Sequence, residues 1–188
     1  MTVTHLEGGF ADPARDAARA FRAALDVMAR PGTIETVVGG EAPARCSPAA
    51  AVLLLTLCDD TTPIYLAGEH DTDSLRAWIT FHTAAPFTGP EHAMFALGKW
   101  EALQPVSRFS IGTSEFPDRA ATLIVEMDAL TAQGATLKGP GIKDTATLSL
   151  PETAAFQRNR AQFPLGFDCF LTSGDRLAGL PRSTLVED

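Results

Sequence analysis

Cysteine, lysine and tyrosine are scarce in this sequence of 188 residues, which contains three cysteines, three lysines and one tyrosine. The cysteines, Cys46, Cys58 and Cys169, are odd in number and lie in or beside apolar segments. Such a pattern favours reduced thiols in a cytoplasmic protein over a disulfide framework. No C-x-x-C or H-x-x-x-H motif occurs, so we predict no metal site.

The lysines are Lys99, Lys138 and Lys143, and none of them lies in a recognisable cofactor motif. Pyridoxal phosphate chemistry needs a lysine for the Schiff base, so we expect no such cofactor. The two glycine-rich nucleotide motifs, G-x-G-x-x-G and G-x-x-x-x-G-K-[ST], are also absent, as is the serine elbow G-x-S-x-G. The sequence therefore predicts no catalytic residue, no cofactor and no cofactor-binding residue.

Long apolar runs are missing too. No segment approaches the roughly 20 apolar residues that span a bilayer, and Met1–Gly9 lacks the features of a secretory signal. The net charge of -8 argues against nucleic acid as the main partner, although a local basic pocket for a small anion stays open. With 45% hydrophobic and 20% charged residues, the chain is expected to fold as one globular domain over residues 1–188.

Three helices have clear start signals. Asp12-Pro13 begins the first, on which Ala17, Phe21, Leu25 and Met28 share one face and Arg15, Arg19 and Arg22 share another. Ser47-Pro48 begins a second helix over 49–58 that is apolar nearly all round and should be buried. A third helix is expected from Asp71 or Thr72 to Phe81.

Short β-branched or alternating segments predict strands between and after these helices. We expect strands over residues 33–38, 63–67, 93–97, 121–128, 135–138, 145–150 and 167–172, and a helix over 151–160. The segment 135–138 is expected to form a hairpin with the strand before it, and 121–128 to have one wetter face. Because strands and helices interleave irregularly, the fold class is α/β, with a mixed sheet flanked by helices.

The least ordinary stretch runs from Leu137 to Asp168. Gly139-Pro140-Gly141 forces a fixed turn, which could bind a phosphate with the help of Lys138 and Lys143 or could simply connect two strands. Asn159 and Arg160 follow the helix, and Arg182 lies beside a proline. Arginine forks suit phosphate or phosphonate oxygens and partner carboxylates alike, so an ion pair is the structural alternative. The candidate ligand-binding residues are Arg160, Arg182, Asn159, Gly139 and Gly141.

Short blocks along nearly the whole chain resemble the PhnH family of the bacterial carbon-phosphorus lyase system. The blocks are Phe10 with Pro13, Phe21-Arg22, Met28 with Pro31-Gly32, Phe81-His82-Thr83, Gly112-Thr113 with Phe116-Pro117, Ala121-Thr122-Leu123, Gly139-Pro140-Gly141-Ile142, Asn159-Arg160, Phe163-Pro164-Leu165-Gly166 with Asp168, and Leu180-Pro181-Arg182-Ser183-Thr184. Their order and spacing carry the resemblance. Two positions depart from it: Ala84 stands where glycine is expected, and Ser183 where threonine is expected.

The resemblance implies a fold similar to pyridoxal phosphate-dependent transferases that has lost the cofactor, assembled as a homodimer. It also implies a core complex with PhnG, PhnI and PhnJ that couples a phosphonate to the ribose of ATP and displaces adenine. It brings no catalytic residue with it. Two rival interpretations are an autonomous small-molecule enzyme using Arg160 and Arg182, and a purely structural interaction subunit.

Overall fold

The computed structural model describes residues 6–188, so the interpretation of Met1–Gly9 lies partly outside it. The α-helices of the described part are α1 (Pro13–Ala29), α2 (Pro48–Leu57), α3 (Asp73–Thr83), α4 (Trp100–Leu103) and α5 (Thr153–Arg160). The first three begin where the sequence predicts, because Asp12, Ser47 and Thr72 each accept a hydrogen bond from a backbone amide of the first turn. None of the helices among the described residues combines the length and the apolarity needed to cross a membrane.

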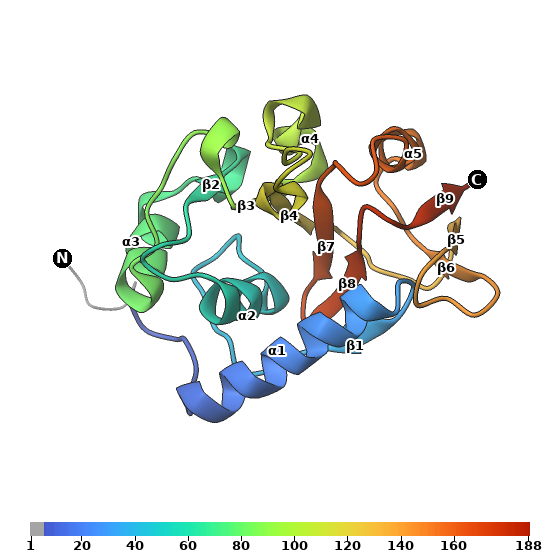
Figure 1. Ribbon diagram of the computed structural model, residues 1–188. Coiled ribbons are helices and arrows are strands. Elements are labelled where there is room, and N and C mark those ends of the chain that lie inside the picture. The colour runs from blue at the N-terminus through green and yellow to red at the C-terminus, as the bar shows by residue number, and fades with distance from the viewer. Residues whose placement is uncertain (1–5) are drawn as a thin grey trace.

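A six-stranded mixed sheet forms the centre of the molecule (Figure 1). Its strands, in spatial order, are β1 (Ile34–Thr36), β8 (Arg176–Leu180), β7 (Asp168–Ser173), β4 (Thr122–Glu126), β3 (Phe95–Lys99) and β2 (Ile64–Leu66). The last four are parallel to one another, whereas β8 is antiparallel to β7 and to β1. The predicted class, α/β with a mixed sheet flanked by helices, is confirmed. The sequence did not predict β8.

A second sheet of three antiparallel strands lies beside the first. It consists of β6 (Ala146–Leu148), β5 (Ala135–Lys138) and β9 (Leu185–Glu187), in that order. The predicted hairpin between β5 and the strand before it is therefore wrong. The physical reason is that β4 is already hydrogen-bonded on both edges, by β3 and β7, and has no edge left for β5.

Two hydrophobic clusters cover the two faces of the central sheet. On one face α1, α2 and α3 pack together, and α2 is buried all round from Ala49 to Leu54, as its sequence predicts. The other cluster includes residues of α4, α5 and the small sheet (Figure 1). Strand β4 contributes to both, because Leu123 and Val125 face one side and Ile124 the other. The expected wetter face of this strand is wrong, since a central parallel strand is covered on both faces.

Helix α1 packs with a different face from the one that its largest apolar residues suggest. Ala20, Ala24 and Val27 are buried against α2 and the sheet, whereas Phe21 and Leu25 are 49% and 55% exposed. The periodicity of the sequence correctly places Phe21 and Leu25 on one side of the helix. It does not show which side the rest of the fold covers.

Helix α3 ends in a backbone conformation that glycine would adopt more easily. Its C-cap, Ala84, is exposed and has a φ of 58°, in the left-handed region, at the position where the resemblance leads us to expect glycine. A side chain in this region costs free energy that glycine avoids. We expect Ala84→Gly to raise the free energy of unfolding by about 0.5–1 kcal/mol and the melting temperature by a few degrees.

Thermal and urea unfolding of the two proteins would check this expectation. The matched control is Ala18→Gly, since Ala18 is an exposed residue inside α1, where glycine should lower stability by about 0.5–1 kcal/mol. If Ala84→Gly lowered stability as Ala18→Gly does, the left-handed cap would not be a source of strain.

Candidate functional site

Polar side chains gather where the parallel strands β2, β3 and β4 end. Glu69 and His70 follow β2, Lys99 is the last residue of β3, and Glu126 is the last residue of β4, with Asp128 two positions beyond it. The carboxyl ends of parallel strands share one edge of the sheet, and ligands of α/β proteins bind outside this edge. We call these five residues, together with Arg45, Cys46 and Ser47, the carboxyl-edge cluster.

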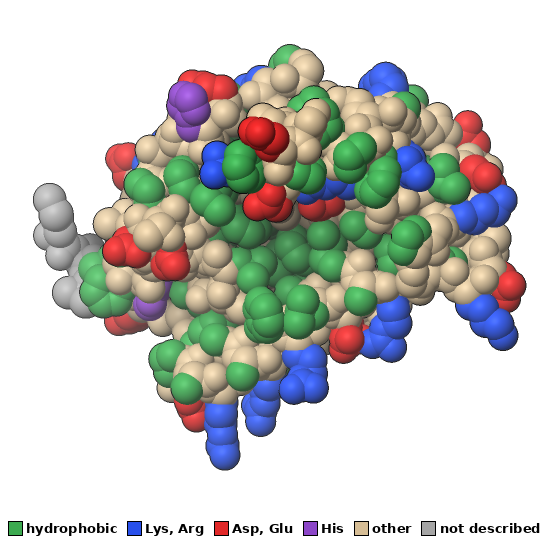
Figure 2. Space-filling view, in the orientation of Figure 1, with side chains coloured by type: hydrophobic (Ala, Val, Ile, Leu, Met, Phe, Trp, Pro, Cys, Tyr) green, Lys and Arg blue, Asp and Glu red, His purple; other side chains and the backbone are tan. Residues whose placement is uncertain are grey.

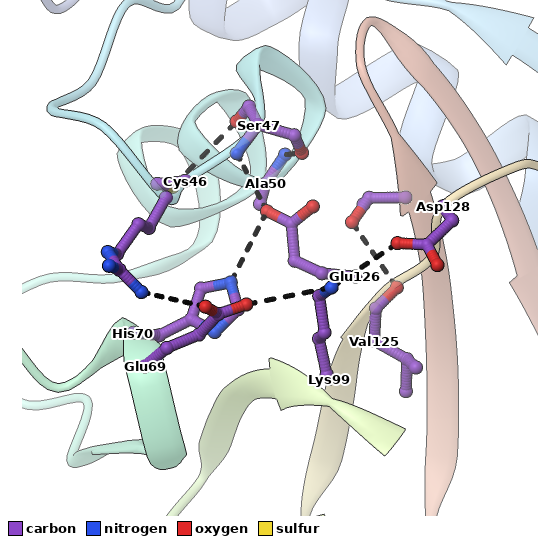
Figure 3. Close-up of polar contacts among 11 residues, drawn as sticks. Cys46, Ser47, Ala50, Glu69, His70, Lys99, Val125, Glu126 and Asp128 are labelled. Atoms are coloured by element: carbon purple, nitrogen blue, oxygen red, sulfur yellow. Dashed lines mark hydrogen bonds and ion pairs between the residues drawn. The ribbon is translucent and has the colours of Figure 1, made fainter. Parts of the chain in front are cut away.

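The start of α2 is tied to this cluster through Ser47 (Figure 3). Its side-chain oxygen accepts a hydrogen bond from the backbone amide of Ala50 at 3.1 Å, which caps the helix. The backbone amide of Ser47 donates to the Oε1 of Glu126 at 2.7 Å. A carboxylate beside the first turn of a helix interacts favourably with its amide groups. Glu126 thus links the end of a central strand to the start of the buried helix.

Glu126 and His70 form a buried pair within the cluster. The Nε2 of His70 lies 4.0 Å from the Oε1 of Glu126, and His70 is only 2% exposed. The Nδ1 of His70 is buried and makes no hydrogen bond within the described residues. Burial raises the pKa of Glu126 above its usual value, against the opposing effect of the Ser47 hydrogen bonds, and burial lowers the pKa of His70. Both shifts favour the neutral forms, so a proton can reside on Glu126 while His70 stays uncharged.

The outer part of the cluster is a set of ion pairs. The guanidinium of Arg45 donates to Glu69 at 2.7 Å, and the Nζ of Lys99 lies 3.3 Å from Asp128 and 3.6 Å from Glu69. Arg45 has a φ of 77°, a left-handed conformation that is uncommon for arginine and that often marks functional sites. Arg45 and Ser47 hold the segment 45–47 at the ends of the strands through their contacts with Glu69 and Glu126.

Neither Cys46 nor Lys99 is activated as a nucleophile. Burial, reinforced by the charge of Glu126, raises the pKa of the Cys46 thiol well above its usual range, so that the thiolate is disfavoured. The hydrogen bond to Asp128, together with the charges of Asp128 and Glu69, raises the pKa of Lys99 and keeps it protonated. A Schiff base needs the neutral amine. The cluster can therefore exchange a proton and hold polar groups, but its thiol and amine are poorly prepared for covalent catalysis.

Two adjoining depressions lie over the cluster. One has a volume of about 300 Å³ and the other of about 280 Å³, and both are lined by Lys99, Glu126 and Asp128. Figure 2 shows one face of the molecule, hollowed near its centre over hydrophobic side chains, with acidic and basic side chains above the hollow. A volume of this size suits a small molecule or a single side chain of a partner.

Replacement of Glu126 by glutamine tests the electrostatics of the cluster. Because the pKa of Glu126 is raised in the folded protein, its ionisation costs stability as pH rises above about 4.5. Glu126→Gln removes this cost and keeps an oxygen that can accept from Ser47. We expect the melting temperature of the variant to exceed that of the wild type by a few degrees at pH 7, and the difference to vanish near pH 4.

The measurement is a series of melting temperatures between pH 4 and pH 8. The pKa of His70 is lowered in the folded protein, so its protonation favours the unfolded chain. Both proteins therefore lose stability from His70 as pH falls through about 6.5. A variant that is less stable than the wild type at pH 7 would show that the cluster stabilises the carboxylate form.

The sequence-predicted residues lie elsewhere. Arg182 is 13% exposed at its side chain and is fully engaged: its Nε and one terminal nitrogen donate to the carboxylate of Asp168 at 3.1 and 2.5 Å, and its other terminal nitrogen donates to the carbonyl of Pro117 at 2.6 Å. Asp168 begins β7 and so lies at the amino ends of the parallel strands, whereas Glu126 lies at their carboxyl ends. Arg182 therefore forms an ion pair with Asp168, which the sequence analysis gave as the structural alternative to ligand binding.

Asn159 and Arg160, at the end of α5, have different surroundings. Asn159 is buried, donates to the carbonyl of Phe167 at 2.9 Å and accepts from the amide of Phe167 at 3.0 Å. The guanidinium of Arg160 lies 4.8 Å from the centre of the Phe163 ring, and its buried Nε makes no hydrogen bond within residues 6–188. Asn159 closes a loop, whereas Arg160 keeps hydrogen-bonding capacity.

Gly139 and Gly141 form the expected turn, which the amide of Ile142 closes by donating to the carbonyl of Gly139 at 3.1 Å. Both glycines have positive φ, 127° and 79°. A Cβ on Gly139 would lie 3.3 Å from the carbonyl oxygen of Ser183, and one on Gly141 would overlap the carbonyl oxygen of Ala29 at the end of α1. The turn is thus packed between two other segments, so close packing explains its glycines without a ligand.

The sequence did not predict Glu126 or His70 as a site. The available signal was a charged residue at or within three residues of the end of each of three short strands, namely Glu69, Lys99 and Glu126, which is typical of the end of a parallel sheet where ligands bind. The parallel order of these strands could not be seen in the sequence.

The fold and the cluster define an α/β protein with polar side chains at the carboxyl edge of a partly parallel sheet. A family model described as bacterial phosphonate metabolism protein (PhnH) matches residues 8–187. A protein of Rhizobium meliloti (strain 1021), named alpha-D-ribose 1-methylphosphonate 5-triphosphate synthase subunit PhnH, is 39% identical over 191 residues, which cover 96% of this chain and 94% of the relative. The chain therefore belongs to the PhnH family, as the sequence resemblance implies.

Proposed function

We propose that this protein is a subunit of the carbon-phosphorus lyase complex of phosphonate catabolism. In this role it supports the transfer of a phosphonate to the ribose of ATP, with loss of adenine, and assembles with PhnG, PhnI and PhnJ. The observation that carries the proposal is the match to the PhnH family over nearly the whole chain, together with the name of the relative. The protonated states of Lys99 and Cys46 support a role without covalent catalysis by this subunit.

Genetic complementation and copurification test the proposal together. A strain without its own PhnH gene, given this chain, should grow with methylphosphonate as the sole phosphorus source, and the tagged chain should copurify with PhnG, PhnI and PhnJ. Failure of the strain to grow when it contains the chain, or purification of the chain alone from cells that contain the other subunits, would overturn it.

The fold is further proposed to be a cofactor-free version of the pyridoxal phosphate-dependent transferase fold, formed as one domain by the whole chain and located in the cytoplasm. The central parallel strands and the charged state of Lys99 support this view, and the three cysteines are unpaired. Incubation with pyridoxal phosphate should give no aldimine absorption band that borohydride abolishes. A labelled lysine would contradict the proposal.

A homodimer is also proposed. Large apolar side chains such as Val38 and Phe81, which is 63% exposed, lie on the surface in regions that a second copy could cover. Light scattering at micromolar concentration should give twice 19.9 kDa. A single species at the monomer mass would contradict the dimer.

The alternative, an autonomous enzyme that binds a phosphate- or phosphonate-bearing ligand through Arg160 and Arg182, stays a prediction. The hydrogen-bonding capacity of Arg160 supports it more than Arg182 does, because the guanidinium of Arg182 already binds Asp168 and Pro117. Calorimetry with ATP and methylphosphonate should then show binding that Arg160→Lys weakens about tenfold or more. Lysine keeps the positive charge but lacks the planar guanidinium, which can donate two hydrogen bonds to one anion. Flat titrations of the wild type would contradict this alternative and favour a purely structural interaction subunit.

A further inference from the structure

Helix α1 carries an apolar stripe that the rest of the described chain leaves uncovered. The stripe consists of the exposed residues Ala14, Ala18, Phe21 and Leu25 and ends at Met28, which is half-buried and packs against the core. Successive members are four, three, four and three residues apart. This is the spacing of the a and d positions of a heptad, which form the narrow seam where one helix packs along another.

One edge of the stripe is positively charged. Arg15 and Arg22 each follow a stripe residue directly and occupy the e positions of the heptad, and Arg19 lies further from the seam. The nearest carboxylates, Asp12 and Asp16, are 3.9 Å from Arg15 and Arg19, so these ion pairs are loose. Figure 2 shows Lys and Arg side chains projecting from the lower side of the molecule, where Figure 1 places α1. The chain as a whole has a net charge of -8, so this basic edge is a local feature.

The other edge of the stripe is not available to a partner. Ala24, at a g position, and Ala20 and Val27 beside it are buried against α2 and β8. A helix laid on the stripe therefore meets Phe21 and Leu25 at its centre and arginines along its only open edge.

A second copy of α1 does not fit this surface. In an antiparallel pair of helices, e positions face e positions, so Arg15 of one copy would meet Arg22 of the other and repel it. In a parallel pair, e positions face g positions, and Ala24 is covered by its own protomer. Charge complementarity instead selects a helix of another protein with Asp or Glu at the edge that meets Arg15 and Arg22.

We propose that the α1 stripe binds an amphipathic helix of a different polypeptide, with an apolar seam on Phe21 and Leu25 and acidic residues against Arg15 and Arg22. The inference rests on the proposed function, because the other subunits of the carbon-phosphorus lyase complex are the candidate owners of this helix. It assigns to α1 the contact that holds this subunit in the complex.

Copurification with tagged protein and coexpressed PhnG, PhnI and PhnJ tests the assignment. Two variants disrupt the surface, Phe21→Ser and the double variant Arg15→Glu with Arg22→Glu, and both should reduce the captured subunits by about tenfold or more. Capture by the wild type should weaken with added salt. Exposed positions affect folding little, so the melting temperatures should stay close to that of the wild type.

Matched controls separate this surface from others. Met94→Ser removes an exposed large apolar side chain before β3, and Arg176→Glu reverses an exposed arginine on β8; neither should change capture. Full capture by both α1 variants would overturn the inference and leave the proposed function intact. Conversion of a dimer to a monomer by Phe21→Ser would overturn it in favour of a second copy. Failure of the wild type to capture any subunit would overturn the proposed function as well.

Discussion

Replacing Asp168 by alanine is expected to lower the free energy of unfolding by about 3–5 kcal/mol. The carboxylate of Asp168 accepts hydrogen bonds from the backbone amide and the guanidinium of Arg182, whose side chain is largely buried. Without Asp168 the guanidinium keeps its bond to the Pro117 carbonyl but remains a buried charge without a counter-charge. Urea unfolding followed by circular dichroism measures the loss.

The matched control is Asp71→Ala on the surface. Asp71 binds Arg76 through two hydrogen bonds, as Asp168 binds Arg182, but both side chains of this pair are 40% exposed. Water replaces the lost contacts there, so the expected cost is at most about 1 kcal/mol. Similar losses for the two variants would contradict the view that burial makes the Asp168–Arg182 pair a structural connection.

Helix starts could be predicted from the sequence because their causes are local. Asp12, Ser47 and Thr72 accept hydrogen bonds from amides three residues further on, and proline follows the first two directly. All the atoms involved lie within one turn of helix. A single stretch of sequence therefore contains the whole physical reason for each boundary.

The candidate site could not be predicted in this way. Ser47 and Glu126 are 79 residues apart, and their hydrogen bond exists only because β4 lies centrally in the sheet and α2 packs across it. The order of parallel strands is decided by packing of the whole chain, which no local pattern records. Arg182 was conspicuous in the sequence because it is charged and follows a proline. In the structure its backbone amide and guanidinium bind Asp168.

The buried face of α1 is a second feature that the sequence could not predict. The periodicity of α1 separates the Phe21 side from the Ala20 side, but packing against α2 and the sheet decides which of the two sides is covered. Close packing on the sheet selects the small residues: the site where a Cβ on Gly179 would stand lies 2.8 Å from Met28 and from the carbonyl carbon of Val27. The large residues remain outside, where they are free for another molecule.

Replacing Gly141 by alanine is expected to be among the most damaging small substitutions in the chain. Gly141 has a φ of 79°, so any side chain there costs about 1–2 kcal/mol. The new Cβ would also overlap the backbone carbonyl of Ala29, which cannot move without shifting the end of α1. Forced overlap in a packed region costs about 1–3 kcal/mol, so the total loss is roughly 2–5 kcal/mol.

Gly174→Ala provides the control that isolates the clash. Gly174 has a similar conformation, with a φ of 58°, but nothing lies within 4 Å of the position that its Cβ would take. Both variants bear the cost of the left-handed backbone and the same change in the unfolded chain, so the difference between their free energies of unfolding measures the contact with Ala29. We expect Gly141→Ala to be less stable than Gly174→Ala by about 1–3 kcal/mol in urea unfolding. Equal stability of the two variants would mean that the turn is not fixed against α1, and its glycines would then need another explanation, such as the phosphate contact that the sequence also allows.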